Sequence, residues 1–83
     1  MYNDFTLFLA HGASFCNRAR VEASAECGCF YCLKKFPPSE IKSWADKGET
    51  PLCPYCGMDS VLGDRCGFEL TDDFLAAMKK SFF

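Results

Sequence analysis

Histidine is nearly missing from this 83-residue chain, which holds a single one, His11. Histidine is the one side chain whose ordinary pKa lies near neutral pH, so the chain has few means of general acid–base catalysis. A nucleophilic pair of His11 with Cys16 or Cys27 would also lack a third group to orient it. We therefore expect a surface or capping role for His11, and no enzymatic activity.

Long apolar runs and strong charge are also absent. The apolar stretch from 5 to 10 is too short to span a bilayer, and no cationic segment precedes it as in a signal peptide. The net charge of −2 disfavours broad electrostatic binding to nucleic acid or to an anionic membrane. We expect a cytoplasmic protein without membrane contact.

The chain is rich in cysteine, with seven residues. Four of them form a C-x2-C-x20-C-x2-C pattern: Cys29, Cys32, Cys53 and Cys56. A two-residue gap lets two thiolates turn onto one metal from a tight loop, called a knuckle, and an odd cysteine count with paired gaps favours metal over disulfides. We predict one Zn²⁺ per chain, bound by these four residues.

Iron is the alternative metal, because Cys-Pro-Tyr-Cys-Gly resembles the rubredoxin knuckle and four thiolates also hold iron. The first knuckle lacks the glycine that normally follows there, which favours zinc. Cys27 lies two residues before Cys29 and would have to displace it as a ligand. The spacing of Cys16, Cys66 and His11 supports no second metal site, so packed thiols are expected at the remaining cysteines.

The expected fold is a single small α+β domain over 1–83: an N-terminal arm and helix (1–26), a zinc ribbon whose two knuckles enclose a helix (27–64), and a C-terminal helix with an aromatic tail (65–83). A chain of this length buries only about 60–65% of its unfolded surface, so a bound metal would add stability that a small core lacks.

Three helices are predicted from their capping residues. The first begins at Ser14 and runs to about Ala25, and the second is capped by Ser39 and ends at Lys47. Thr71 caps the third, with acidic residues in its first turn and lysines in its last. The side chains predicted to face inward are Ile41, Trp44 and Ala45 on the second helix and Phe74, Leu75 and Met78 on the third.

The remaining segments are predicted as extended or short structures. Thr50 precedes a proline, which pushes it out of the helical region, and 50–52 therefore leads into Cys53 as an extended segment. The run 60–62 is typical of a strand returning after the second knuckle. Residues 1–13 form an apolar cluster that is either a short helix or a strand.

The motifs resemble those of a family of small, uncharacterised bacterial cytoplasmic proteins. The resemblance is carried by CGCFYCLKKFPPSEI (27–41), Trp44, LCPYCGMDSVLGD (52–64), and GFELT (67–71) with Phe74-Leu75, closing on Phe82-Phe83. Asn17-Arg18 upstream also fits, and coverage runs from about His11 to Phe83. The resemblance implies a zinc-ribbon-like fold and no particular activity, whereas Arg65-Cys66 departs from the pattern.

The sequence is compatible with three functions, of which a redox or hydrolytic enzyme is the least favoured. Knuckles around a helix also resemble degenerate HNH-type nucleases, but the segment between them here holds no histidine. A nucleic-acid-binding face would use basic and aromatic residues of the middle segment, Arg18, Arg20, Lys34, Lys35, Lys42, Tyr31 and Trp44. Lys34 and Lys35 more simply offset the negative metal site, and Trp44 is expected to be buried.

The favoured function is a non-enzymatic zinc-binding module that contacts a protein partner or a second copy of itself. Phe68, Phe82 and Phe83 are the predicted contact residues, because nine phenylalanines are more than a chain of this size readily encloses. Packing of these three side chains onto their own core is the competing prediction.

Overall fold

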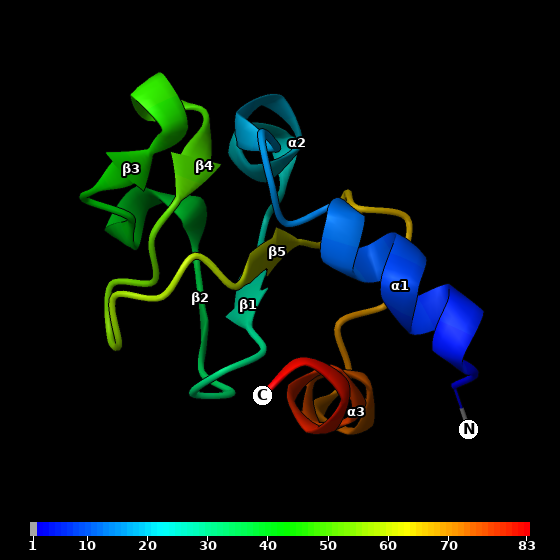
Figure 1. Ribbon diagram of the computed structural model, residues 1–83. Helices are drawn as coiled ribbons and strands as arrows, with labels where there is room; N and C mark the ends of the chain where they lie inside the picture. Colours follow the sequence, from blue (N-terminus) through cyan, green and yellow to red (C-terminus); the bar gives the residue numbers. More distant parts are fainter. Residues whose placement is uncertain (1) are drawn as a thin grey trace.

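The computed structural model describes residues 2–83 and places a small antiparallel sheet between helices and a knuckle region (Figure 1). The helices are α1 (Asp4–Gly12), α2 (Arg18–Ala23) and α3 (Asp72–Phe82). The strands are β1 (Cys27–Cys29), β2 (Lys35–Phe36), β3 (Trp44–Ala45), β4 (Thr50–Pro51) and β5 (Val61–Gly63). Two 3-10 turns, Pro38–Glu40 and Asp46–Gly48, complete the secondary structure of the described residues.

The central sheet has the order β2-β1-β5, with both pairs antiparallel. Successive residues of a strand point to opposite faces of the sheet, so neighbouring residues of β5 pack into two different cores. Leu62 packs with α1 and α3, whereas Val61 packs with α2 and the knuckles. Gly28 of β1 faces Leu75, and a Cβ there would lie 2.9 Å from the leucine Cδ1. A larger residue at this position would require the Leu75 side chain to shift.

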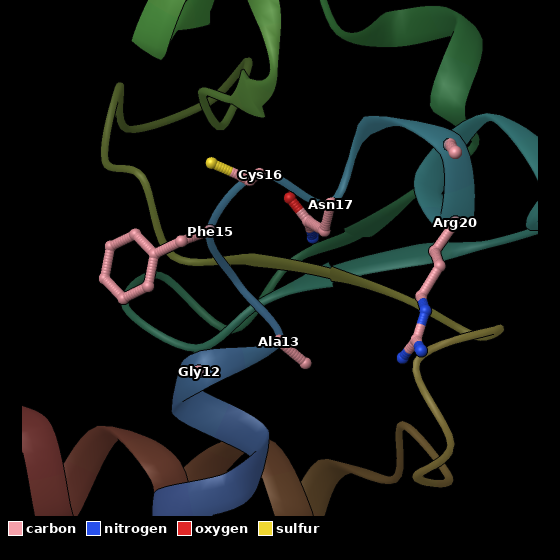
Figure 2. Close-up of a pocket in the computed structure, with 7 residues that line it drawn as sticks. Gly12, Ala13, Phe15, Cys16, Asn17 and Arg20 are labelled. Atoms are coloured by element: carbon pink, nitrogen blue, oxygen red, sulfur yellow. The ribbon is translucent and has the colours of Figure 1, made fainter.

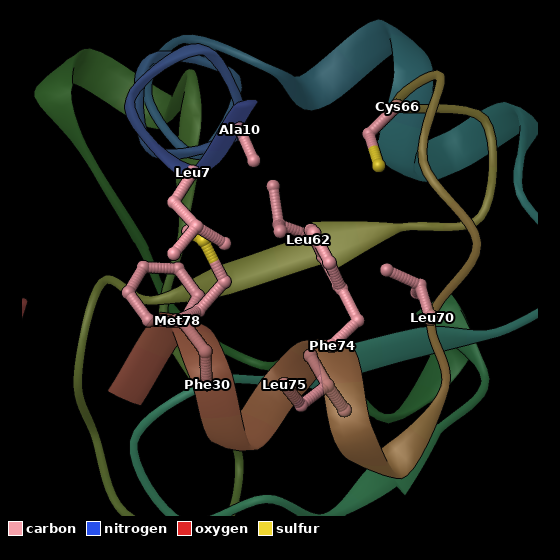
Figure 3. Close-up of a cluster of buried hydrophobic side chains, with 9 residues drawn as sticks. All are labelled: Leu7, Ala10, Phe30, Leu62, Cys66, Leu70, Phe74, Leu75 and Met78. Atoms are coloured by element: carbon pink, nitrogen blue, oxygen red, sulfur yellow. The ribbon is translucent and has the colours of Figure 1, made fainter. Parts of the chain in front are cut away.

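The first core lies between α1, β5 and α3. Figure 3 shows Leu62 between Leu7 and Ala10 of α1 and the inward side chains of α3. The α3 residues buried there are Phe74, Leu75 and Met78, as the sequence predicts. Thr71 caps α3, since its side chain accepts a hydrogen bond from the Phe74 amide at 3.0 Å. The prediction for the third helix is therefore confirmed.

The prediction for the first helix is wrong at its start. Asn3 caps an earlier helix, α1, and the Ser14 hydroxyl donates to the His11 carbonyl at 2.7 Å just after α1 ends. The short α2 begins only at Arg18, because the buried Asn17 side chain donates to the Val61 carbonyl of β5. A bond between distant segments thus fixes the helix start, which local propensity cannot indicate.

The predicted second helix, from Ser39 to Lys47, is also wrong. In its place β3 and β4 form a hairpin whose turn has positive φ at Asp46, Lys47 and Gly48. The Asp46 carboxylate accepts a hydrogen bond from the Thr50 hydroxyl at 2.7 Å, so turn chemistry overrides the helical spacing. Trp44 is consequently half-buried on β3 rather than enclosed on a helix.

The extended segment at 50–52 and the strand at 60–62 are found as β4 and β5, the latter displaced by one residue. The apolar cluster of 1–13 is α1. Within residues 2–83, no helix has the length and apolar character needed to cross a bilayer.

Candidate metal centre

Four cysteine sulfurs from two separate loops meet at one point beside the sheet. The Sγ atoms of Cys29, Cys32, Cys53 and Cys56 all lie within 4.8 Å of one another. Cys29 is 3.6 Å from Cys56, and Cys32 is 3.6 Å from Cys53. A tetrahedron with metal–sulfur bonds of about 2.3 Å has edges of roughly 3.8 Å, so this spacing fits a bound ion far better than a disulfide, which needs about 2.05 Å.

The two knuckles repeat one hydrogen-bond pattern. The Tyr31 amide donates to the Cys29 sulfur at 3.4 Å, and the Tyr55 amide donates to the Cys53 sulfur at 3.4 Å. The chain then turns back, because the Leu33 amide donates to the Cys29 carbonyl and the Gly57 amide to the Cys53 carbonyl, each at 2.9 Å. Amides aimed at sulfur stabilise thiolates, which is what a metal requires.

The thiols differ in how readily they ionise. Burial acts to raise the pKa of the Cys29 thiol, but hydrogen bonds from the Ser60 hydroxyl and from the Cys32 and Tyr31 amides outweigh it and lower the pKa below its ordinary value. For Cys56, burial is the largest cause that raises the pKa to about 12. Burial likewise raises the pKa of Cys53.

One lowered and two raised thiol pKa values are expected for a group of close thiols, because each negative sulfur opposes ionisation of the next. A divalent cation removes that repulsion and permits all four to be thiolates. Cys29 and Cys53 are buried among apolar residues of the second core, and Cys32 and Cys56 are half-buried. Four protein ligands around a tetrahedral ion leave no position for water or substrate.

The other cysteines do not join this cluster. Cys27 faces the second core, where burial, followed by the nearby Asp64 and Glu26 carboxylates, raises its pKa to about 12. Cys66 is buried in the first core, and burial raises the pKa of its thiol as well. The part of the chain from 2 to 83 contains no second group of cysteine, histidine and carboxylate ligands around one point.

Cys16 is exposed and lines a surface pocket of about 380 Å³ at the start of α2. Figure 2 shows its sulfur pointing away from the Arg20 guanidinium, which lies along the other side. The Asn17 Oδ1 atom is buried nearby without a hydrogen-bond partner. The Cys16 sulfur and the Arg20 guanidinium therefore do not converge on one point of this pocket.

His11 lies within a row of rings that runs from the surface past the buried Phe30. Its imidazole stacks on Phe82 at 4.2 Å and meets Phe15 edge-on at 5.1 Å. The Phe30 ring contacts the rings of both Phe82 and Phe83. The Phe83 ring in turn contacts Tyr31 of the first knuckle at 4.8 Å. We call this set the aromatic row: Phe15, His11, Phe82, Phe30, Phe83 and Tyr31. Among the described residues, no hydrogen bond links His11 to Cys16 or Cys27.

The predicted contact residues of the C-terminal segment differ in how deeply they are buried. Phe82 and Phe68 are half-buried against the first core, and Phe68 stacks on Phe74 at 5.7 Å. Phe83 remains exposed. The packing of Phe68 and Phe82 is what the competing prediction of a core role requires.

The outward side of α1 is an exposed apolar surface that the sequence interpretation missed. Phe5, Phe8 and Leu9 are largely exposed, opposite the buried Leu7 and Ala10. A sequence signal existed, since apolar residues occupy both sides of this helix. The pattern alone is compatible with either a helix or a strand at 1–13.

Three basic residues of the middle segment contact different partners. The Arg18 guanidinium lies 4.4 Å from the centre of the Trp44 ring, and it also pairs with Glu22. Lys35 pairs with Asp72, while Lys34 lies over the Tyr55 ring at 5.4 Å. Lys79, in the last turn of α3, lies over the Tyr31 ring at 5.2 Å.

Comparison with known proteins identifies no relative: no family model matches the chain, and no curated protein or solved structure is significantly similar to it.

Proposed function

We propose that this protein is a zinc-ribbon-like module in which one Zn²⁺ per chain has a structural role and the surface contacts another protein. The observation that carries the metal assignment is the convergence of four cysteine sulfurs from two knuckles with the same hydrogen bonds. Four sulfur donors in a tetrahedron suit zinc, with iron as the alternative. Reduced cysteines of this kind fit a cytoplasmic location.

A structural role follows from the donor set. Catalytic zinc keeps one position for water, whereas four cysteine ligands fill a tetrahedron. The single histidine lies between two phenylalanine rings rather than beside a carboxylate or a nucleophile. These features favour a module without enzymatic activity, as does the absence of converging acid and base groups among the described residues.

Protein contact is supported by the exposed aromatic side chains. Tyr31, Phe83, Phe15 and the outward side of α1 all carry large apolar area at the surface. Exposed apolar patches of a few hundred Å² on small proteins commonly mark interaction sites.

A nucleic-acid-binding ribbon remains the second candidate, favoured by one observation. Lys34 over Tyr55 and Lys79 over Tyr31 place a positive charge beside an exposed ring on each knuckle, as in stacking platforms for single strands. Salt-dependent retention on immobilised single-stranded DNA or RNA distinguishes this function. Loss of retention in Tyr31→Ala and Tyr55→Ala would support it over protein contact.

Elemental analysis of the purified protein tests the metal assignment. We expect one zinc per chain, a strong loss of zinc in Cys53→Ser, and full retention in Cys16→Ser as the matched control. Two metals per chain, or full occupancy in Cys53→Ser, would overturn the assignment.

A further inference from the structure

The outward side of α1 is an apolar helix face without a partner in the described chain. Phe5, Phe8, Leu9 and Gly12 lie within an arc of about 100° on the helix, opposite the buried residues. Phe15 extends this surface past the end of the helix. We call Phe5, Phe8, Leu9 and Gly12 the outer face of α1.

A groove runs beside this face along the seam between α1 and α3. Its wider part has a volume of about 760 Å³ and is lined by residues of both helices, among them Leu7, Ala77 and Lys80. A second part continues to Phe8 and Phe82, and the two parts share Asp4, Leu7 and Ser81. Projecting phenylalanines and a groove that can receive rings therefore lie next to each other on one surface.

We propose that the outer face of α1 and the adjoining groove bind a second copy of this chain, forming a symmetric dimer. This inference rests on the proposed protein-contact function and names its partner. In a two-fold arrangement the same patch meets itself, so Phe5 and Phe8 of each copy enter the groove of the other. A surface that carries both the projections and the groove suits such a pairing.

The charges agree with this partner. From 5 to 15 the sequence contains no Asp, Glu, Lys or Arg, so the face offers nothing to a nucleic acid, an acidic peptide or an anionic membrane. The groove carries the carboxylates of Asp4 and of Asp73 in the first turn of α3, and the ammonium group of Lys80 near the end of α3. A two-fold axis perpendicular to α3 would place each Lys80 toward the Asp73 of the other copy.

The exposed phenylalanine area is a large part of what an interface needs. Phe5, Phe8 and Phe15 are 69%, 64% and 41% exposed. At about 200 Å² for each side chain they present roughly 350 Å², to which Leu9 and the groove add. A standard interface buries about 800 Å² per partner, so the phenylalanines alone supply close to half.

Sedimentation velocity across a concentration series, on the zinc-loaded full chain, tests the dimer. We expect a monomer–dimer equilibrium in which Phe8→Arg raises the dissociation constant about 100-fold or more, because each dimer contains the substituted residue twice. Leu9→Arg, on the same face, should act in the same direction. Zinc content should stay near that of the parent, since both side chains are exposed, and so should the melting temperature at concentrations where the parent is monomeric.

Two controls separate this site from other exposed rings. Tyr55→Ser removes a ring of similar exposure on the second knuckle, and Phe83→Arg alters the far end of the aromatic row. Both variants should dimerise like the parent. A parent that is monomeric at about 100 μM, a dimer that persists in Phe8→Arg, or one lost only in Phe83→Arg would each overturn the proposal.

Two further measurements distinguish the dimer from the function on which it rests. A chain without bound zinc that still dimerises through Phe8 would contradict the structural-zinc function and support the interface. A zinc-loaded monomer that sediments with neutral phosphatidylcholine vesicles through Phe8 would contradict the dimer and assign the face to lipid.

Discussion

At the scale of single residues, Leu33 and Gly57 occupy the same position in the two knuckles, but the backbone conformation there is strained for leucine and not for glycine. Leu33 has φ 66° and Gly57 has φ 80°. The left-handed region disfavours a residue with a Cβ by roughly 1–2 kcal/mol. We predict that Leu33→Gly raises the free energy of unfolding by about 1 kcal/mol, because the half-exposed leucine gives up little burial.

Gly57→Ala is the matched variant in the second knuckle. A Cβ there would meet no atom within 4 Å, so backbone strain is its only expected cost, lowering stability by about 1 kcal/mol. Urea denaturation of the zinc-loaded proteins measures both changes. Equal effects of the same sign in the two knuckles would contradict the assignment of strain to Leu33.

Thiol reactivity distinguishes the cysteines that lie outside the metal centre. Cys16 is exposed, whereas Cys27 and Cys66 are buried and burial raises the pKa of each thiol. Since the thiolate is the reactive form, we predict one fast-reacting thiol in the zinc-loaded protein at pH 8. Labelling with a thiol reagent followed by mass analysis should place it at Cys16, and Cys16→Ser should abolish the fast phase. A fast phase that remains in that variant would contradict the burial of the other thiols.

At the scale of elements, the hairpin of β3 and β4 depends on one buried hydroxyl. The Thr50 hydroxyl donates to Asp46 at 2.7 Å and accepts from the Cys16 amide at 2.9 Å, thereby joining the hairpin to the loop before α2. Thr50→Val keeps the shape but leaves both partners without their bond, and we predict a loss of about 2 kcal/mol. Thr50→Ser keeps the hydroxyl and should cost about 1 kcal/mol through the lost methyl group. Thermal unfolding compares the two, and equal losses would show that packing rather than hydrogen bonding matters at this position.

The same elements explain how far the sequence could be interpreted. The third helix and the cysteine cluster were predictable, because a cap at Thr71 and a two-residue cysteine gap act over a few neighbouring residues. The hairpin was not, since its turn, with positive φ at Asp46 and Lys47, is held by a hydrogen bond from Thr50 to Asp46, and either turn residue alone is compatible with a helix. The start of α2 depends on a bond from Asn17 to β5, which lies outside any local window.

At the scale of the whole molecule, the metal centre and both cores share the central sheet. Cys29 belongs to β1, which pairs with β5, and β5 carries Leu62 into the first core. Structural zinc contributes on the order of 10 kcal/mol in isolated fingers, against a total of about 5–15 kcal/mol for a domain. We predict that chelation lowers the melting temperature steeply. The far-ultraviolet signal of the helices and the Trp44 fluorescence should change together, and an unchanged melt in the metal-free protein would contradict the linkage.

Metal affinity should also depend strongly on pH. In the metal-free protein the pKa of Cys56 is raised to about 12, so its folded state holds the proton more tightly than the unfolded chain does. The stability from this proton is present below the unfolded pKa of about 8.5 and is lost as pH rises toward the folded value. Zinc binding has the opposite effect and favours the deprotonated Cys56 in the folded state, because a thiolate ligand must release its proton.

Two of the four thiols, those of Cys53 and Cys56, are expected to be protonated before binding at neutral pH, because the pKa of each is raised. The apparent dissociation constant for zinc should then rise roughly 10²-fold or more for each unit by which pH falls below 7. Calorimetric titration in buffers of different ionisation enthalpy counts the protons released, and we predict at least two per zinc. Release of one proton or fewer would mean that the thiols are already ionised in the metal-free protein, contrary to the raised pKa values of Cys53 and Cys56.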